Sequence, residues 1–598
     1  MKTWLLAFLA LFTVALIAIW QLGLLDLAYR SALLSLAFLT VYLPDWGRQS
    51  LGVAWAQWWN IGLPARWVAY ESDPTLQRRT QELALLMSFA LVALLLQLPW
   101  RSGRMLRTSR VHGSAHWATL WEARSLVAYL PWTRKARRES QLPLGYRGWV
   151  KLTLKERQLE RHVIVIGPTG AGKTAGLIIP ALLSERGQRS LFIIDPKSEL
   201  VRLTAGVISQ RMTVWVFAPT ASLSHRYNPL AWISSMEDAE TFALCWVQNT
   251  GLSNDPFWDR CAYLMITAAV LHLRHSTPEV PPLASLVDLL CGSSFEELQK
   301  TLLTSPSANA RAIVRTFLKS LELSEKTAAG VMTDLASRFF WLSDPRLRTL
   351  TASNDLDFVA MTERNIALYM SIPATEAERL QPLSACLLTQ MFATILKQAS
   401  KQASGKLPRG VTCYLDEFAN AGKVPHIGQY VTMLRSTGVG LFITVQNFAH
   451  LDSLYGKEIR ETILANAATH IILPGVGHEE AKVYAERIGQ TTAIARSVSR
   501  GSSSDSEGEQ EIGRWLILPA ELRTMKEAIC FSEGLPPIRV RLRPYYRSRL
   551  KRLAGWPFPS LQASMTGVSP DGSMSHQESL PEPSSQVSPE VDRRFSPD

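Results

Sequence analysis

Cysteine is scarce in this chain, and its few cysteines are not arranged to bind metal or to form a disulfide framework. The 598 residues contain six cysteines, none in a CxxC spacing, and no cluster of histidine and cysteine suggests a zinc site. They are Cys245, Cys261, Cys291, Cys386, Cys413 and Cys530. Most stand in apolar segments, as reduced core residues of a cytosolic protein do. The sequence therefore excludes a disulfide-built domain and a zinc-finger reader of DNA bases.

Acidic residues are also under-represented, because 63 Lys and Arg face only 51 Asp and Glu, a formal net charge of +12. This excess favours acidic partners, nucleic acid or anionic lipid, although the basic loops of a membrane protein explain part of it equally well. No helix typical of base recognition is visible. Any contact with DNA is therefore expected to use phosphates, without sequence preference and with strong salt dependence.

A phosphate-binding loop is the most informative motif of the chain. An apolar strand over residues 163–166 precedes it, and a helix over residues 173–183 follows it. Pro180 lies inside this helix and is expected to bend it. Glycines let backbone N–H groups surround phosphate oxygens, Lys173 reaches the β- and γ-phosphates, and Thr174 ligates Mg²⁺. The loop matches GxxxxGK[ST] and comprises Gly167, Pro168, Thr169, Gly170, Ala171, Gly172, Lys173 and Thr174. The sequence thus predicts a site for ATP and Mg²⁺.

The second half of such a site follows later strands. Residues 411–415 form an apolar run that leads into Asp416 and Glu417. We expect Asp416 to hold Mg²⁺ through water and Glu417 to orient and deprotonate the attacking water. Gln446 ends the next strand, over residues 440–445. It either senses the γ-phosphate or positions water, or it simply bonds to the backbone. Arg435, between these strands, is either an arginine finger for a neighbouring subunit's nucleotide or an ordinary surface arginine.

Two long apolar runs at the start of the chain predict a membrane anchor. Residues 4–25 are long enough to span a bilayer, and residues 83–98 form a second, slightly short run. Four arginines between residues 101 and 110, with no acidic residue among them, mark the cytoplasmic side. We predict two spans, an external loop over residues 26–81, and a cytoplasmic N-terminus and remainder.

Two other topologies are less consistent with the sequence. A cleavable signal peptide would have a shorter apolar stretch and a small-residue cleavage site, and it would export an ATPase away from its ATP. A third span over residues 32–43 is too short, and it would place the phosphate loop outside the cell.

Downstream, apolar strand-like runs alternate with helical patterns, which predicts an α/β domain with a parallel sheet. Residues 496–511 cannot bury an apolar face and are expected to be a flexible loop. The predicted parts are a membrane anchor (1–100), a juxtamembrane segment (101–160), an ATPase domain (161–230 and 351–546), an all-α insertion (231–350) and a disordered tail (547–598).

These motifs together resemble the type IV secretion coupling proteins, the TraG/TraD family of inner-membrane ATPases, over roughly residues 1–546. Ser198 stands where many members have Gly, and His116 where many have Arg; neither is at the expected hydrolytic centre. Besides the phosphate loop, the matching segments are His112–Ala118, Asp195–Glu199, Tyr227–Leu230, Asp255–Trp258, Leu415–Phe418, Val445–Gln446, Tyr455–Gly456 and Pro536–Arg539.

The resemblance implies a RecA-like motor at the bacterial inner membrane. It implies six identical subunits around a channel, ATP bound between neighbours, and Arg435 as the arginine finger. The partners would be a relaxase with single-stranded DNA, effector proteins, or both, delivered to a type IV secretion channel. It also links the all-α insertion to substrate recognition.

Two other functions remain open from the sequence. One is a docking receptor in which ATP serves mainly for assembly, and the other is a double-stranded DNA pump of the FtsK type. The latter usually has four spans, a long linker and a winged-helix reader, none of which is visible. An ABC transporter would need an LSGGQ-like signature, which the chain lacks.

Overall fold

The computed structural model describes residues 111–129, 133, 139–251, 255–320, 325–500 and 505–558. All of them belong to the compact unit Arg110–Asp598. Within these residues, no helix combines the length and apolar character needed to cross a bilayer. The two predicted spans, the external loop and the tail beyond residue 558 lie outside the described residues.

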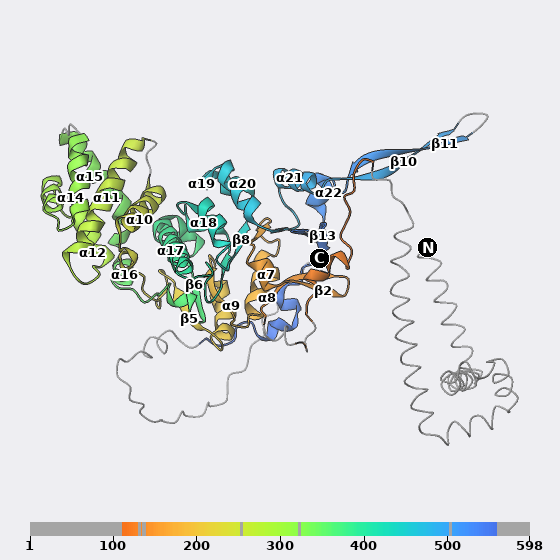
Figure 1. Ribbon diagram of the computed structural model, residues 1–598, viewed down its shortest axis with the longest axis horizontal. Coiled ribbons are helices and arrows are strands. Elements are labelled where there is room, and N and C mark those ends of the chain that lie inside the picture. The colour runs from red at the N-terminus through yellow and green to blue at the C-terminus, as the bar shows by residue number, and fades with distance from the viewer. Residues whose placement is uncertain are drawn as a thin grey trace, which may run out of the picture. The chain divides into compact units, whose positions relative to one another are not determined.

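A nine-stranded sheet forms the centre of this unit (Figure 1), in the order β13-β12-β9-β3-β8-β7-β4-β6-β5. The seven strands from β9 to β5 are parallel, whereas β12 and β13 are antiparallel additions at one edge. The predicted α/β class is therefore confirmed, with a mixed sheet. The strands are β3 (Val163–Ile166), β4 (Ser190–Ile194), β5 (Thr213–Phe217), β6 (Ile366–Met370), β7 (Val411–Leu415), β8 (Val439–Val445), β9 (Thr469–Ile472), β12 (Ala528–Ser532) and β13 (Ile538–Val540).

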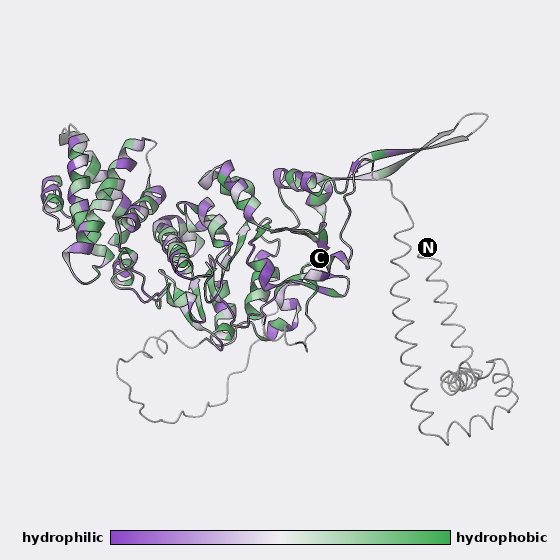
Figure 2. Ribbon diagram, in the orientation of Figure 1, coloured by the Kyte–Doolittle hydropathy of each residue, from purple (hydrophilic) through white to green (hydrophobic). Residues whose placement is uncertain are grey.

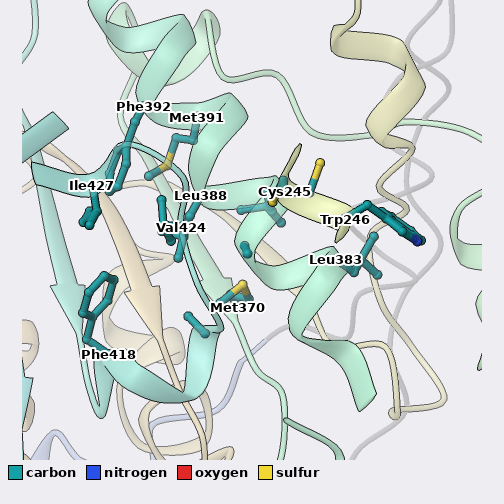
Figure 3. Packing of buried hydrophobic residues seen from close by; sticks show 14 of the residues in the cluster. Cys245, Trp246, Met370, Leu383, Leu388, Met391, Phe392, Phe418, Val424 and Ile427 are labelled. Atoms are coloured by element: carbon teal, nitrogen blue, oxygen red, sulfur yellow. The ribbon is translucent and has the colours of Figure 1, made fainter. Parts of the chain in front are cut away.

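The central strands are apolar at nearly every position because both faces of the sheet are covered. In β3, Ile164 and Ile166 face one buried core, and Val163 and Val165 face the other. Figure 3 shows the first core, where side chains of α17 and α18 pack together. The helices of the two faces are α8 (Ile179–Leu183), α9 (Glu199–Ile208), α17 (Ala374–Ser400), α18 (Ile427–Leu434), α19 (Phe448–Tyr455), α20 (Lys457–Asn466), α21 (His478–Ile488) and α22 (Pro519–Thr524).

The segment between β5 and β6 is a helical bundle, without a strand among its described residues. Figure 2 shows both hydrophobic and hydrophilic positions along its helices, the pattern of amphipathic helices that enclose a core. That core is continuous with the first core of the sheet, since Trp246 stacks on Phe339 and Trp341. The helices are α10 (Met236–Thr250), α11 (Pro256–Ser276), α12 (Leu283–Cys291), α13 (Phe295–Leu303), α14 (Ala308–Ser320), α15 (Glu325–Phe339) and α16 (Pro345–Leu350).

A small antiparallel hairpin precedes the sheet in the chain. It consists of β1 (Leu142–Arg147) and β2 (Val150–Leu154) and is followed by the short helix α7 (Glu156–Leu159). Reciprocal backbone hydrogen bonds join Tyr146 to Arg541, at 2.9 and 2.8 Å. The hairpin therefore packs at the β13 edge of the large sheet.

The prediction of a flexible loop over residues 496–511 is wrong. Apart from residues 501–504, which lie outside the described residues, they belong to a second hairpin, of β10 (Gln490–Arg500) and β11 (Asp505–Trp515), paired in unbroken antiparallel register. The prediction of a loop failed because backbone hydrogen bonds can pair two strands that have no apolar face.

The predicted start of the disordered tail, residue 547, is also wrong. Residues 545–552 form two short 3₁₀ helices, and Leu550, Leu553 and Phe558 pack on the second core of the sheet. The Gly555 N–H donates to the carbonyl of Leu203 in α9 at 3.0 Å. Disorder was predicted from the basic composition of this segment, although its apolar side chains pack on the sheet and hold it in place.

Candidate nucleotide-binding site

Apart from Arg435, the predicted site residues follow the carboxyl ends of three adjacent strands. The phosphate loop follows β3, Gln446 follows β8, and Asp416 and Glu417 follow β7. Because β8 pairs with both β3 and β7 in parallel, these three ends lie side by side at one edge. The topology thus brings together residues up to 279 positions apart in the sequence, as a ligand site at the carboxyl end of a parallel sheet requires.

Two glycines give the phosphate loop its backbone path. Gly170 and Gly172 have φ angles of +82° and +91°, in the left-handed region that residues with a Cβ avoid. Gly167 has a different reason, because a Cβ there would lie 2.6 Å from the Cβ of Leu473. The loop therefore depends on glycine both for its conformation and for its close packing.

The helix that leaves the loop begins with a π-helical turn over Thr174–Ile178, which continues into α8. The Ile179 N–H donates to the Thr174 carbonyl, one residue further back than in an α-helix. Pro180, for which a bend was predicted, stands in the first turn of α8, where its missing N–H costs little. Wide turns of this kind occur frequently at functional sites.

Lys173 is buried, and its ammonium group points back at the loop. Its Nζ donates to the carbonyl of Gly167 at 2.6 Å and to that of Pro168 at 3.2 Å. Burial lowers the pKa of Lys173, and the positive charge of Lys197 adds to this, while Asp416 and Glu417 oppose it. A polyphosphate would offer the charged ammonium better partners than two neutral carbonyl groups.

Asp416 joins the two halves of the site. One of its oxygens accepts a hydrogen bond from the Thr174 hydroxyl at 2.8 Å, and the other accepts one from the Thr444 hydroxyl at 2.8 Å. Burial raises the pKa of Asp416, and the charge of Glu417 raises it further, against the two hydroxyl hydrogen bonds and Lys173. The carboxylate is therefore held in place but poorly compensated in charge.

Thr444 is a site residue that the sequence analysis missed. Besides donating to Asp416, its hydroxyl accepts a hydrogen bond from the Glu417 N–H at 2.9 Å. It is completely buried in β8, and a lone hydroxyl inside an apolar strand was the only signal that could have found it.

Glu417 stands at a sharp backbone turn directly after β7. Its φ is +50°, an uncommon value for a residue with a side chain, and one that is found preferentially at functional sites. The Asn420 side chain donates to its carboxylate at 3.0 Å, which orients the group. Asn420 was not predicted either, although it lies only three residues further on.

Gln446 and Arg435 occupy different ends of the strands. Gln446 is half-buried beside the phosphate loop, where the Gly167 N–H donates to the carbonyl of Val445 at 3.2 Å. Arg435 follows α18, just before β8 begins, and pairs with Glu533 at 3.6 Å. The structure therefore brings Gln446 to the site and leaves Arg435 at the opposite, amino end of the strands.

Asp195, at the end of β4, is a further buried carboxylate near the site. It accepts hydrogen bonds from the backbone N–H groups of Glu199 at 3.1 Å and Val201 at 2.8 Å. Burial raises its pKa, and these hydrogen bonds oppose the rise. Asp195 thus caps the first turn of α9, and Lys197 lies just before this helix begins.

The donors at this edge fit Mg²⁺ held mainly by its nucleotide. In the part of the chain that the structure describes, no group of three or more His, Cys, Asp or Glu side chains could hold a metal ion by themselves. One hydroxyl and one buried carboxylate are instead present, from Thr174 and Asp416. Mg²⁺ usually takes one or two such protein groups together with waters and substrate phosphates.

The fold and this site define a P-loop nucleotide-binding protein with a predominantly parallel sheet. A family model described as "Type IV secretory system Conjugative DNA transfer" matches residues 120–580. The match covers more than half of the chain, so the chain belongs to this family. The predicted resemblance to type IV coupling proteins is confirmed.

Curated relatives of known name agree with this membership. The chain is similar to the protein VirD4 of Rhizobium radiobacter, with 25% identity over 476 residues, covering 75% of this chain and 66% of the relative. VirD4 of Agrobacterium fabrum is 24% identical over 513 residues, covering 82% and 74%. The conjugal transfer protein TraG of Escherichia coli is 23% identical over 396 residues, covering 61% of each chain.

Solved structures share the fold. The unbound conjugative coupling protein TrwB, in its N-terminally truncated form, superposes with a TM-score of 0.54 at 18% identity, covering 68% of this chain and 88% of TrwB. TrwB in complex with the GTP analogue GDPNP gives 0.52 at 17%, covering 66% and 88%. At these identities the likeness concerns the fold alone.

Proposed function

We propose that the chain is the coupling ATPase of a type IV secretion system. It hydrolyses ATP and uses the energy to drive a relaxase–single-stranded DNA complex, effector proteins, or both towards the secretion channel. The observation that carries the proposal is the hydrogen bond between Thr174 and Asp416, which joins two motifs 242 residues apart into one nucleotide site. Structures of TrwB with GDPNP, and with ADP and Mg²⁺, support nucleotide and Mg²⁺ binding.

Each site residue has one task in this reaction. Lys173 exchanges its two loop carbonyl groups for the β- and γ-phosphate oxygens. Thr174 and Asp416 hold Mg²⁺, which neutralises charge on the phosphates when it is bound. Glu417, oriented by Asn420, accepts the proton of the attacking water, and Gln446 positions that water.

Arg435 acts on the nucleotide of a neighbouring subunit. It stands before β8, whereas the phosphate loop follows β3, so the length of the sheet separates the two within one chain. Its side chain is 36% exposed and therefore available to a second copy. An arginine supplied in this way fits a closed ring of subunits joined head to tail, which we propose to be a hexamer.

Membrane attachment and substrate recruitment are further parts of the proposal. Two apolar runs, residues 4–25 and 83–98, support an anchor in the bacterial inner membrane with a cytoplasmic N-terminus and motor. The helical bundle between β5 and β6 is the expected receptor for the substrate. The net charge of +12 supports contact with nucleic acid through phosphates.

The experiment that tests this proposal mixes two inactive variants. Lys173→Ala removes the phosphate clamp and should lower turnover by about 10²–10³-fold. Arg435→Ala should lower it by about 10³-fold or more, the value of an arginine finger. In an equal mixture, about one interface in four joins an intact Lys173 to an intact Arg435, so a measurable part of the activity returns.

The outcomes separate the competing functions. Recovery on mixing that rises with protein concentration supports an ATPase whose sites are shared between subunits. Full activity of Arg435→Ala alone would contradict the shared site, and substrate transfer unimpaired in Glu417→Gln would favour the docking receptor. The ATP turnover of the wild-type protein is also measured with single-stranded DNA, and the same protein without DNA is the matched control. Turnover that requires duplex DNA would favour an FtsK-like pump.

A further inference from the structure

Trp149 is the most exposed large hydrophobic residue among those the structure describes. It lies at the tip of the β1–β2 hairpin, and its side chain is fully exposed, at 101% of the reference value. The preceding Gly148, with φ of +58°, makes the turn that carries it outward. Tryptophan usually buries most of its ring, so a fully exposed one at a hairpin tip indicates a contact outside this unit.

The base of this hairpin is firmly held. Leu142, Leu144, Leu152 and Leu154 are buried in the second core of the sheet. Two backbone hydrogen bonds between Tyr146 and Arg541 tie β1 to the β13 edge. The packed base of the hairpin therefore sets the backbone position of Trp149 at its tip.

The hairpin rests on the segment that follows the second predicted membrane span. The Ala128 N–H donates to the Lys151 carbonyl at 3.0 Å, Val127 bridges to Leu152, and the Arg147 guanidinium donates to the Ala118 carbonyl. The described part of this segment begins at residue 111, about a dozen residues after the predicted span ends at residue 98. A chain of that length reaches at most about 45 Å, so residue 111 can lie no further than that from the end of the predicted span.

The same segment carries further exposed apolar groups next to arginines. Leu120 is 38% exposed and Trp121 56%, and the Arg124 guanidinium lies 4.6 Å from the centre of the Trp121 ring. Tryptophan combined with arginine is typical of protein surfaces at the headgroup level of a bilayer, where the rings enter and the cations meet anionic lipids.

We propose that Trp149 and the exposed face of residues 118–124 contact the anionic surface of the bilayer. This contact is additional to the spans and would hold the β13 edge of the sheet against the membrane, with the helical bundle directed away from it. It rests on the proposed membrane anchoring. The chemistry requires a lipid headgroup layer, because a soluble anion would bind the arginines without engaging the indole ring.

The test places a fluorescent probe at the tip of the hairpin in the full-length chain. Trp149→Cys is labelled in a Cys291→Ser background, since the other five cysteines are buried. The protein is reconstituted into vesicles of phosphatidylethanolamine and phosphatidylglycerol. The matched control is Phe340→Cys, a residue 77% exposed in the helical bundle, which joins the sheet at the opposite, β5 edge. ATP hydrolysis and co-flotation with vesicles check folding and insertion.

Nitroxide-labelled lipids should quench the probe at residue 149 several-fold more than the probe at residue 340, and a water-soluble quencher should show the reverse order. Equal quenching at the two positions, in protein that floats with vesicles, overturns the lipid contact alone. Protection of residue 149 from both quenchers also overturns it and indicates a contact between subunits. Protein that does not float contradicts the anchoring itself, and the lipid contact with it.

Discussion

The two ends of the parallel strands hold buried polar groups of opposite kinds. At the amino ends, Arg189, His162 and His470 are surrounded by partners that match their charge and hydrogen-bonding capacity. At the carboxyl ends, Lys173 and Asp416 have neutral carbonyl and hydroxyl groups as hydrogen-bond partners, and the effect of burial on their pKa values outweighs the attraction between their charges. Both sets are fixed in position, but only the first is compensated by the protein itself.

Arg189, directly before β4, is the clearest example at the amino ends. Its side chain is 2% exposed and donates to the carboxylates of Glu156 at 3.0 Å and Glu160 at 2.9 Å. It also donates to the Thr412 hydroxyl at 2.9 Å and the Val411 carbonyl at 3.1 Å. A buried cation so completely paired has a structural role, because it has no free donor to offer a ligand.

The carboxyl ends differ because their buried groups, Lys173 and Asp416, have no charged hydrogen-bond partner. Burial lowers the pKa of Lys173 and raises that of Asp416, so burial disfavours the charged form of each group. Buried, perturbed groups of this kind cluster where a ligand later supplies the missing charge. The comparison therefore assigns stability to one end of the sheet and nucleotide chemistry to the other.

The largest effect on stability is expected for Arg189→Met. It leaves Glu156 and Glu160 without their cation and should lower the free energy of unfolding by about 3–5 kcal/mol, measured in denaturant. Arg435→Ala is the matched control, because its exposed pair with Glu533 should be worth less than about 1 kcal/mol. A loss as small as that of the control would show that the amino ends are not the structural part of the sheet.

The sequence predicted the three strands that carry the site well, because each is a short apolar run followed by residues of the site. The expected strand over residues 411–415 coincides with β7, and that over 440–445 differs from β8 by one residue. The phosphate loop and the Asp416–Glu417 pair were also visible, since their chemistry requires fixed residue types at fixed spacing.

What the sequence could not predict depends on contacts between distant segments. Thr444 becomes a site residue only because β8 lies beside β7, and nothing local distinguishes it from other strand threonines. Arg189 looks like any charged residue before a strand until its five partners, the four named above and the Gly438 carbonyl, are known. The β10–β11 hairpin was missed because backbone pairing can stabilise strands that have no apolar side.

A smaller effect concerns acid stability at the amino ends. In His162 and His470, one ring nitrogen faces a carbonyl, of Val431 at 2.8 Å or Ala467 at 3.0 Å. The other faces a donor, the Leu441 N–H at 3.1 Å or the Tyr484 hydroxyl at 2.7 Å. These partners fix the neutral form. Burial lowers the pKa of each histidine to about 4, and the charges of Arg435 and Arg487 add to this.

Because the folded protein lowers the pKa of both histidines, it should lose stability as the pH falls. The unfolded chain takes up a proton near pH 6.5 and the folded protein only near pH 4, so stability is full above pH 6.5 and falls as the pH drops towards 4. The loss by pH 5 should be about 2 kcal/mol for each histidine. Denaturant unfolding at pH 7 and pH 5 measures it, and His162→Gln should reduce the difference. An unchanged pH dependence in that variant would rule out the contribution of His162.

The smallest effect should have the opposite sign and is expected for Asp416→Asn. The raised pKa of Asp416 means that its ionised form destabilises the folded protein; this cost is absent below the ordinary carboxyl pKa and complete above the raised one. At neutral pH an uncharged amide, which can still bond to Thr174 and Thr444, should therefore leave the nucleotide-free protein equally stable or more stable, by about 1 kcal/mol at most.

The same variant should lose the rise in melting temperature that Mg²⁺ adds in the presence of a non-hydrolysable ATP analogue. Thr412→Val, which removes one partner of Arg189, is the control from the amino ends and should lose stability while keeping the Mg²⁺ response. A destabilised Asp416→Asn protein that still responds to Mg²⁺ would mean that Asp416 supports the fold, and the division between the two ends of the sheet would fail at its central residue.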